Sequence, residues 1–338
     1  MRVLATPLSV GRLVHRPAFA AADGGYGNAM TACVFAPSPL LTVTIEPGDG
    51  DTSEVHLHAG GQGFWIARML VALGVPTEVC VPLGGEVGQV LETLMAAEGV
   101  RVRVGTRTRG NGAYVHDRRG GERETVADMP PTVLSRHEVD ELYSSTLASG
   151  LASDVTVLGG PSTPDVIPAD VYRRIAADLR AAGKPVVADL SGESLTAALQ
   201  GGVTVLKVSH DDLVEDGRAE GEDVDALIQA IRTLSKEGAE HVVVSRGGDP
   251  TIACIDGEML EVQTPQMQRV DHRGAGDSMT AGLATALAHG ASMSEALRLG
   301  SAAGTSNVTR RGLATGQREV VEQLAEHIVV RPLRTPRS

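Results

Sequence analysis

Two hydrophobic patterns alternate along the chain. Apolar residues spaced three or four positions apart are typical of helices that bury one face, and they predict helices over 61–73, 85–99, 170–182 and 223–237. Each helix ends near a glycine, a common helix terminator. A run rich in β-branched residues follows each of these helices and predicts strands over 77–81, 100–104, 185–189 and 241–245. An earlier run predicts a further strand over 31–36. Strands that alternate with helices favour a mostly parallel sheet with helices on both faces.

Two segments depart from this pattern. Residues 41–58 are predicted to form a hairpin around Pro47-Gly48-Asp49-Gly50, because proline and glycine favour tight turns. Residues 100–127 alternate polar and apolar positions, with glycine turns at 110–112 and 120–121. Alternation of this kind is typical of strands with one face in water. We therefore expect both segments to form a small lid beside the main sheet, able to close over a substrate and exclude water.

The two ends of the chain show neither pattern. Residues 1–29 combine three arginines with the apolar run AFAAA, which faintly resembles a signal peptide. Charged and turn-forming residues interrupt the apolar core, so we reject that interpretation. Met30 offers an alternative start just before the first strand. We expect residues 1–29 to lie outside the fold, the domain to cover 30–330, and residues 331–338 to form a tail.

Composition and charge narrow the function. The 338 residues are 42% hydrophobic and 21% charged, which is ordinary for a globular enzyme. The net charge of −12 argues against a nucleic acid or an anionic membrane as partner. No apolar run of the sequence reaches the roughly 20 residues that span a bilayer. The three cysteines have neither metal-ligand nor disulfide spacing, so we expect a reduced, cytoplasmic location.

A glycine-rich loop before a predicted helix carries the strongest chemical signal. The stretch DHRGAGDSMTAG, residues 271–282, places Gly274, Ala275 and Gly276 directly before Asp277. A helix N-terminus with exposed backbone N–H groups attracts anions such as phosphate. A carboxylate beside such a site needs a role, for example accepting a proton, and this combination suggests phosphoryl transfer. The simpler alternative is that Asp277 only caps the helix.

Further motifs accompany this loop in a fixed order. They are AGGQGFWIARMLVALGV (59–75), PLGGEVGQVLETLMAAEGV (82–100), GGPSTPDVIPADVY (159–172), LKVSHDDL (206–213), VVVSRGGD (242–249) and NVTRRGLA (307–314). Over residues 31–330 the series resembles the ribokinase/PfkB family of carbohydrate kinases, most of all its 1-phosphofructokinase and tagatose-6-phosphate kinase branch. The resemblance implies a three-layer α/β ribokinase-like fold with a small β-lid. It also implies transfer of the γ-phosphate of ATP to a sugar hydroxyl, with Mg²⁺.

The resemblance assigns roles to the residues of a transfer site. The catalytic base and the anion hole for the phosphoryl group would be formed by Asp277 and by Gly274, Ala275 and Gly276. A KPNxxE motif that helps to bind the nucleotide is matched by Lys207, Ser209 and Asp212, and Asp212 would organise Mg²⁺ through water. The loop that approaches the nucleotide is matched by Ser245, Gly247 and Gly248.

The acceptor side departs from the family pattern. There the resemblance implies substrate contacts from Thr42, Gly60, Gly61, Gln62, Trp65, Arg107 and Asp277. Thr42 stands where the branch has an aspartate that grips sugar hydroxyls, Gln62 replaces a lysine, and Trp65 replaces an asparagine. Trp65 would either stack on the substrate or fill the sheet edge. Arg107 matches a lid arginine that meets a sugar phosphate; otherwise it would pair with a glutamate across the lid.

Three functions remain open from the sequence. The leading one is an ATP-dependent kinase whose small-molecule partner is a sugar or sugar phosphate. The second is a nucleoside kinase of the same fold, with Trp65 stacking on a base. The third is a nucleotide- or sugar-binding protein with weakened catalysis, although the intact GAGD loop counts against it. Because lid edges in the resembling family often pair between subunits, a homodimer through the lid is a further hypothesis.

Overall fold

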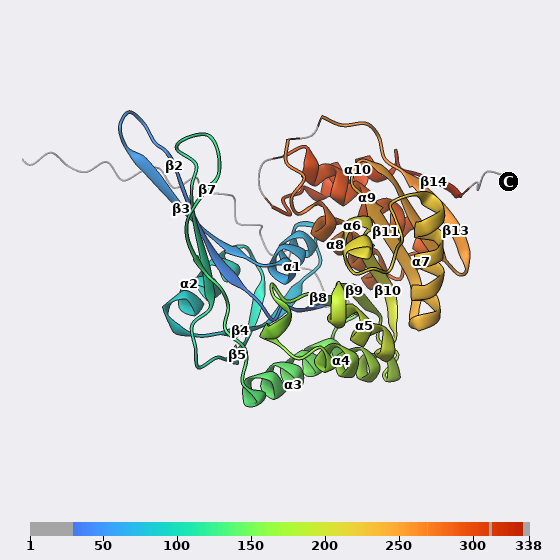
Figure 1. Cartoon of the computed structure of the whole chain (residues 1–338), viewed down its shortest axis with the longest axis horizontal. Coiled ribbons are helices and arrows are strands. Elements are labelled where there is room, and N and C mark those ends of the chain that lie inside the picture. The colour runs from blue at the N-terminus through green and yellow to red at the C-terminus, as the bar shows by residue number, and fades with distance from the viewer. Residues whose placement is uncertain (1–29, 269, 311–312, 334–338) are drawn as a thin grey trace, which may run out of the picture.

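The computed structural model describes residues 30–268, 270–310 and 313–333. The expected extension 1–29 and residues 334–338 of the expected tail lie outside these ranges. Within them, the chain forms a large sheet covered by helices and a smaller sheet that stands beside it (Figure 1). No helix in these ranges is long and apolar enough to cross a membrane.

The large sheet has ten strands within the described ranges. In spatial order they are β14 (Val329–Pro332), β13 (Glu258–Gln263), β12 (Asp249–Ile255), β11 (Ala239–Arg246), β10 (Val203–Ser209), β9 (Val186–Asp189), β8 (Val155–Gly159), β1 (Ala32–Phe35), β4 (Thr77–Leu83) and β5 (Arg101–Thr106). Every pairing from β11 to β5 is parallel, whereas β12, β13 and β14 add an antiparallel edge. The predicted mostly parallel sheet is confirmed, and β14 carries it past the expected domain end at 330.

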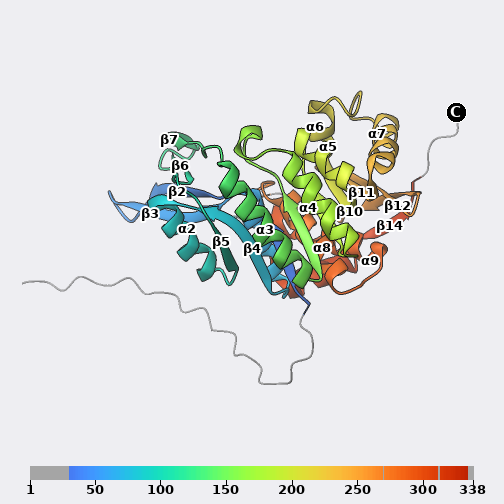
Figure 2. The ribbon, with the colours of Figure 1, turned by 90° about the horizontal axis from the view of Figure 1, so that it is seen from below.

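Helices cover both faces of the large sheet (Figures 1 and 2). One layer contains α1 (Gln62–Ala72), α2 (Gly85–Ala97), α8 (Ala275–Ala288), α9 (Met293–Val308) and α10 (Arg318–Ala325), and the other contains α3 (Arg136–Ala152), α4 (Asp170–Ala181), α5 (Gly192–Gly201) and α7 (Val224–Glu237). Strand β1 shows how the layers arise, because Ala32 and Val34 join one buried apolar cluster while Cys33 and Phe35 join the other. A strand that is apolar on both sides must be buried on both sides. The expected three-layer fold is therefore confirmed.

The smaller sheet forms the lid. Its spatial order is β3 (Ser53–Gly60), β2 (Leu40–Pro47), β6 (Gly112–Asp117) and β7 (Glu124–Met129). The β2–β3 hairpin occupies the segment predicted at 41–58. The lid segment predicted at 100–127 is wrong in its first part, because β5 pairs with β4 in the large sheet. β5 is an edge strand there, and an edge strand with a solvated face has the same alternating pattern as a lid strand.

Candidate active site

The loop before α8 turns sharply at a glycine. Gly274 has a φ of 74°, a left-handed conformation that side chains rarely adopt, and a Cβ there would lie 2.8 Å from the Ala314 nitrogen. The helix begins at Ala275, so Gly274 is the N-cap and Asp277 lies in the first turn. The alternative in which Asp277 only caps the helix is therefore wrong.

Donor groups gather at this helix start. The Ala275 amide donates to the His272 carbonyl at 3.3 Å, whereas the Gly276 amide makes no hydrogen bond among the described residues. A Cβ on Gly276 would lie 2.6 Å from Lys207 Nζ, so the ammonium stands against the loop. A backbone donor and an ammonium at one helix N-terminus together suit a phosphate.

A buried cluster of charged side chains stands behind the loop. Asp189 ends β9, and Lys207 lies opposite it on β10. Lys207 Nζ is 3.2 and 3.3 Å from the two carboxylate oxygens of Asp189, and both side chains are buried. Thr280 on α8 donates its hydroxyl to the same carboxylate at 2.6 Å. Because these buried polar groups are bonded to one another, they hold the Lys207 ammonium in one place.

Asp277 is half-buried beside this cluster, and its pKa is raised from 3.8 to about 7. Burial is the main cause, the Asp189 carboxylate adds to it, and the Lys207 ammonium acts in the opposite direction. Burial alone would lower the pKa of Lys207, but Asp189 and Asp277 outweigh it, so the Lys207 pKa is raised and the amine stays charged. A carboxyl group that exchanges a proton near neutral pH suits general-base catalysis.

On the expected nucleotide side, Ser209 and Asp212 bond to each other. They form a capping box at the start of α6 (His210–Glu215), in which Ser209 Oγ donates to Asp212 Oδ2 at 2.5 Å and accepts from the Asp212 amide at 3.0 Å. The negative charge of Asp212 contributes to the raised pKa of Lys207. The capping box therefore fixes a carboxylate within electrostatic reach of the phosphate site.

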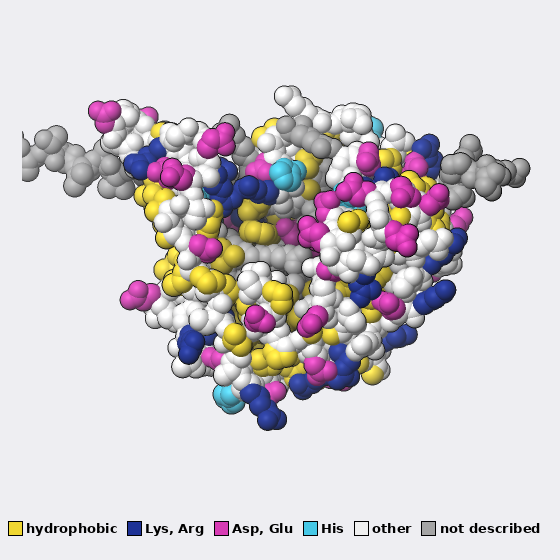
Figure 3. All heavy atoms as spheres, in the orientation of Figure 1, with side chains coloured by type: hydrophobic (Ala, Val, Ile, Leu, Met, Phe, Trp, Pro, Cys, Tyr) yellow, Lys and Arg dark blue, Asp and Glu magenta, His cyan; other side chains and the backbone are white. Residues whose placement is uncertain are grey.

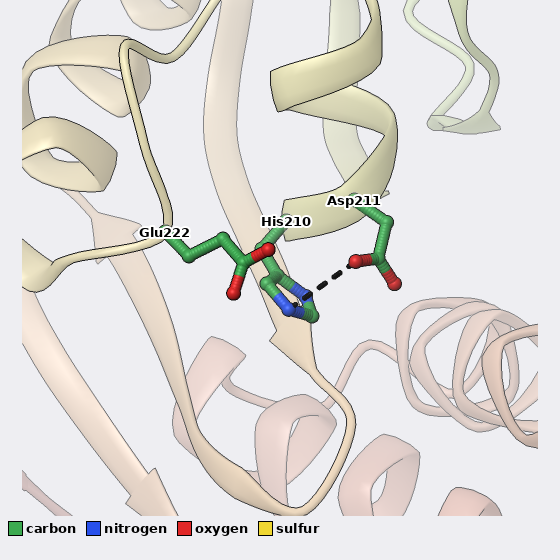
Figure 4. Close-up of side chains that lie close together, drawn as sticks. All are labelled: His210, Asp211 and Glu222. Carbon is green, nitrogen blue, oxygen red and sulfur yellow. Dashed lines mark ion pairs between the residues drawn. The ribbon is translucent and has the colours of Figure 1, made fainter.

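Three side chains that could share a metal ion lie next to this capping box. His210, Asp211 and Glu222 place one ligand atom each within 4.8 Å of the others (Figure 4). His210 Nδ1 lies 3.3 Å from the Ser245 carbonyl, which can only accept, so Nδ1 carries a hydrogen and Nε2 faces Asp211 Oδ1 at 3.4 Å. Asp211 and Glu222 are exposed, as ordinary solvated acids are. The sequence did not predict this group, because Glu222 lies in a separate loop.

The remaining residues of the expected nucleotide side lie at the turn between β11 and β12. Gly247 has a φ of 57° and a Cβ there would meet nothing within 4 Å, and both Gly247 and Gly248 are exposed. Ser245 directs its hydroxyl to the Val208 carbonyl at 3.5 Å. Arg246 donates to the Pro250 carbonyl at 3.3 Å and lies 3.9 Å from Asp249, so it braces the hairpin.

The expected acceptor residues at the lid hinge lie together. Gly61 joins β3 to α1 with a φ of 102°, and a Cβ there would lie 2.7 Å from the Ser38 carbonyl oxygen. A Cβ on Gly60 would lie 3.1 Å from Thr42 Oγ1, so Thr42 stands directly beside the two glycines. Gln62 Oε1 accepts from the Gly160 amide at 2.6 Å, which ties the start of α1 to the end of β8. Gln62 therefore has a bracing role that its position in the motif did not reveal.

Trp65 and Arg107 differ in their surroundings. Trp65 is half-buried and packs against the apolar cluster beneath α1. Arg107 follows β5 and is only 5% exposed, and its Nη2 donates to the Thr132 carbonyl at 2.5 Å and to the Thr132 hydroxyl at 2.9 Å. Among the described residues, Arg107 pairs with no glutamate across the lid, so that alternative is wrong.

Two residues of the buried cluster were not expected from the sequence. Asp189 closes the buried strand VVAD, and a carboxylate at the carboxyl end of a parallel strand is a signal that could have identified it. Ligands of open α/β sheets bind at that edge. Thr280 lies in a small-residue helix and gives no comparable signal.

These features together define a class of enzyme. A carboxyl group that titrates near neutral pH, a fixed ammonium and a helix N-terminus meet at the carboxyl ends of β9 and β10. A four-stranded lid stands beside them (Figure 1). Positioned donors, a base and a lid that excludes water are the parts of a phosphoryl-transfer site.

The chain belongs to the pfkB family of carbohydrate kinases, whose model matches residues 26–319. It is 27% identical over 273 residues to the 1-phosphofructokinase of Bacillus subtilis, covering 81% of this chain and 88% of that protein. It is 30% identical over 307 residues to the ATP-dependent 6-phosphofructokinase isozyme 2 of Mycobacterium tuberculosis, covering 85% and 89%. The structure of phosphofructokinase-2 from Escherichia coli in complex with fructose-6-phosphate, 24% identical, matches with a TM-score of 0.76 over 88% of this chain and 99% of that one.

The resemblance seen in the motifs is therefore confirmed. The protein is a carbohydrate kinase that transfers a phosphoryl group from ATP to a hydroxyl of a sugar or sugar phosphate.

Proposed function

We propose that Asp277 is the general base of this phosphoryl transfer. As the acceptor hydroxyl attacks the γ-phosphorus of ATP, Asp277 takes the hydroxyl proton and a new oxygen–phosphorus bond forms. The bond from phosphorus to the β–γ bridging oxygen breaks, and ADP leaves. The observation that carries this proposal is the place of the Asp277 carboxylate, half-buried in the first turn of α8 beside Lys207 with a pKa of about 7.

The charge that develops on the transferring group would meet donors that are already in position. Gly274, Ala275 and Gly276 provide the turn and the backbone of the anion hole, and Lys207 adds a full positive charge against Gly276. Since Asp189 and Thr280 hold Lys207 before any substrate binds, little reorganisation is needed during the reaction. This supports catalysis and argues against a protein that only binds its ligand.

The nucleotide would extend from this loop toward Lys207, Ser209, Ser245, Gly247 and Gly248. Bound Mg²⁺ supplies charge neutralisation between the phosphate groups. Asp212 fits an indirect contact through water, because its Oδ2 is already bonded to Ser209. The carboxylate would thus orient a hydrated ion without displacing its water.

The acceptor would lie between Asp277 and the hinge residues Thr42, Gly60, Gly61 and Gln62. Thr42 offers one hydroxyl group, whereas a carboxylate at this position would accept stronger hydrogen bonds from the two hydroxyls of a diol. Trp65 packs against the core beneath α1, which favours support of the pocket over stacking on a nucleobase. These observations favour a sugar or sugar phosphate over a nucleoside.

Replacing Asp277 by asparagine tests the proposal. Asp277→Asn removes the proton acceptor at constant size and should lower kcat by about 10²–10⁴. Affinity for an ATP analogue should stay equal or improve, because a negative charge leaves the phosphate site. The matched control is Asp225→Asn, which changes an exposed acid in the first turn of α7. Activity of Asp277→Asn within a few-fold of the control would contradict the proposal.

We also propose that two copies of the chain associate through their lids. Val55 and Leu57 on β3 and Met129 on β7 lie on the same lid face, and they are 57%, 44% and 48% exposed. Such a contiguous exposed apolar face favours association. The variant Leu57→Lys should shift the mass measured by light scattering from two chains toward one, with Glu54→Lys as control. An unchanged mass for Leu57→Lys would argue against this interface.

A further inference from the structure

Three side chains that the proposed transfer does not use meet where β10 passes into α6. His210 begins α6, Asp211 follows it, and Glu222 comes from the loop between α6 and α7. The two acids approach the imidazole from opposite sides (Figure 4). One ligand atom of each residue lies within 4.8 Å of the others, and the described residues contain no second group of this kind. Because Glu222 belongs to a separate loop, the fold and not the local sequence brings the three together.

The His210 imidazole is held so that one nitrogen is offered to the two acids. Its Nδ1 lies 3.3 Å from the Ser245 carbonyl oxygen near the end of β11, and this oxygen only accepts, so Nδ1 carries the hydrogen. The other nitrogen, Nε2, lies 3.4 Å from Asp211 Oδ1. Histidines that bind metals commonly donate their second N–H to a backbone carbonyl or a carboxylate, which fixes the ring. Ser245 gives His210 this support from outside the group.

The contact between His210 and Asp211 requires a cation. A neutral Nε2 and a carboxylate oxygen are both acceptors, so they repel unless a positive charge lies between them. A metal ion that binds two ligands at about 2.0–2.2 Å in tetrahedral geometry holds the two ligand atoms roughly 3.3–3.6 Å apart. The 3.4 Å from His210 Nε2 to Asp211 Oδ1 lies in this range. A second proton on the imidazole would also remove the repulsion, so a proton and a metal ion are the two alternatives to separate.

The surroundings and the ligand types indicate which cation fits. Residues 210–225 contain eight acidic side chains and a single arginine, and Figure 3 shows acidic side chains gathered over α6 and the loop that follows it. Such a field concentrates cations. One imidazole nitrogen and two carboxylates suit Zn²⁺ and neighbouring first-row ions, whereas Mg²⁺ prefers oxygen ligands and keeps several waters. The three cysteines are buried, so thiolates do not compete for an added ion.

We propose that His210, Asp211 and Glu222, the α6 triad, bind a divalent transition-metal ion of the Zn²⁺ type, separate from the Mg²⁺ that accompanies ATP. Both acids are exposed, so water completes the coordination and the ion enters directly from solvent. The bound ion would join the loop between α6 and α7 to the carboxyl ends of the paired strands β10 and β11. The α6 triad thus adds a second kind of metal site to this kinase.

Calorimetric titration of the full chain with Zn²⁺, in buffer that contains millimolar Mg²⁺, tests this inference. The wild type should bind one ion, and Co²⁺ as a spectroscopic probe should give visible absorption that added Zn²⁺ removes. His210→Gln and Glu222→Gln should each weaken Zn²⁺ binding by at least the about 10–100-fold that loss of a supporting group costs at a metal site. Glu220→Gln is the matched control, an exposed acid of the same loop outside the triad. His56→Gln is a second control, because His56 lies 3.3 and 3.9 Å from two glutamates of the lid.

Thermal unfolding gives an independent measurement. Zn²⁺ should raise the Tm of the wild type because it binds the folded chain, and Glu222→Gln should lose this shift while its Tm without Zn²⁺ stays that of the wild type. Equal Zn²⁺ affinity in the wild type and both triad variants, or an equal loss in His56→Gln or Glu220→Gln, would overturn the inference. Displacement of Zn²⁺ by millimolar Mg²⁺ would show adventitious binding to solvated acids and overturn it too. The activity of Asp277→Asn has no bearing on these results, since the triad lies outside the proposed transfer machinery.

Discussion

The transfer side proposed at the carboxyl ends of β9 and β10 and the lid of this kinase differ in how their charged side chains are partnered. At the transfer side, Lys207 is buried and bonded to Asp189, which Thr280 also holds. On the lid, Arg123 is exposed and lies within 4.0 Å of no carboxylate oxygen among the described residues. Buried, mutually bonded groups are positioned before substrate arrives, whereas exposed groups on a lid acquire their partner when it closes. The body thus holds its charged side chains in fixed positions, whereas the lid leaves Arg123 open to solvent.

The backbone supports the same contrast. The transfer side is built on the carboxyl ends of β9 and β10 and on the first turn of α8. These elements are covered by helices on both faces of the sheet. The lid strands, by contrast, leave the large apolar side chains of Val55, Leu57 and Met129 exposed. Substitutions in the two regions should therefore affect different quantities.

The largest expected effect is a loss of stability when the buried ion pair of the body is broken, compared with breaking an exposed ion pair of the lid. Lys207→Met leaves Asp189 buried and unpaired, which should lower the free energy of unfolding by about 3–5 kcal/mol. Arg119→Met breaks the exposed pair with Asp117 and should leave the free energy of unfolding nearly unchanged, because water screens such a pair. Chemical denaturation of both variants measures the difference. Similar losses for the two would remove the distinction between a preorganised and an open region.

The next effect concerns the anion hole alone. A Cβ on Gly276 would lie 2.6 Å from Lys207 Nζ, so Gly276→Ala must displace the ammonium or the loop. We expect kcat/KM to fall about 10²–10³-fold, as for loss of one positioned donor. Gly120→Ala, at an exposed turn with nothing within 4 Å of its Cβ, controls for a general glycine effect. Loss of folding without loss of activity per folded molecule would contradict a role at the transferring phosphate.

The smallest effect is a dependence on pH. Asp277 accepts a proton only when ionised, and its pKa in the folded chain is about 7. The kcat/KM for the acceptor should therefore fall about tenfold per pH unit below that value. The free energy of unfolding should change in the opposite sense. Between pH 3.8 and 7 the folded chain holds a proton on Asp277 that the unfolded chain has released, so the free energy of unfolding falls as the pH rises through that window. A pH–rate profile whose acid limb lies near 4 would show that Asp277 is not the titrating base.

The sequence predicted the local parts of the site better than the distant ones. The loop 274–277 could be recognised because a turn, a helix start and a carboxylate are neighbours in the chain. Asp189 lies 91 residues from Thr280, and Gln62 lies 98 residues from Gly160, so those contacts depend on strand order that periodicity does not specify. Strand β5, which precedes Arg107, shows a different failure. The alternating pattern of β5 suits either a lid or a sheet edge, so its pattern alone did not place it in the large sheet.

The position of Trp65 has a practical consequence. It is the only tryptophan of the chain, and it lies in the first turn of α1, four residues after Gly61, where the lid strand β3 enters the body. Its indole is half-buried, so its solvent contact can both rise and fall. Intrinsic fluorescence excited at the indole therefore reports one defined location without any label. An acceptor and an ATP analogue can be titrated in separate experiments while the Trp65 emission is recorded. The change in emission with each ligand would show how that ligand alters the surroundings of the hinge.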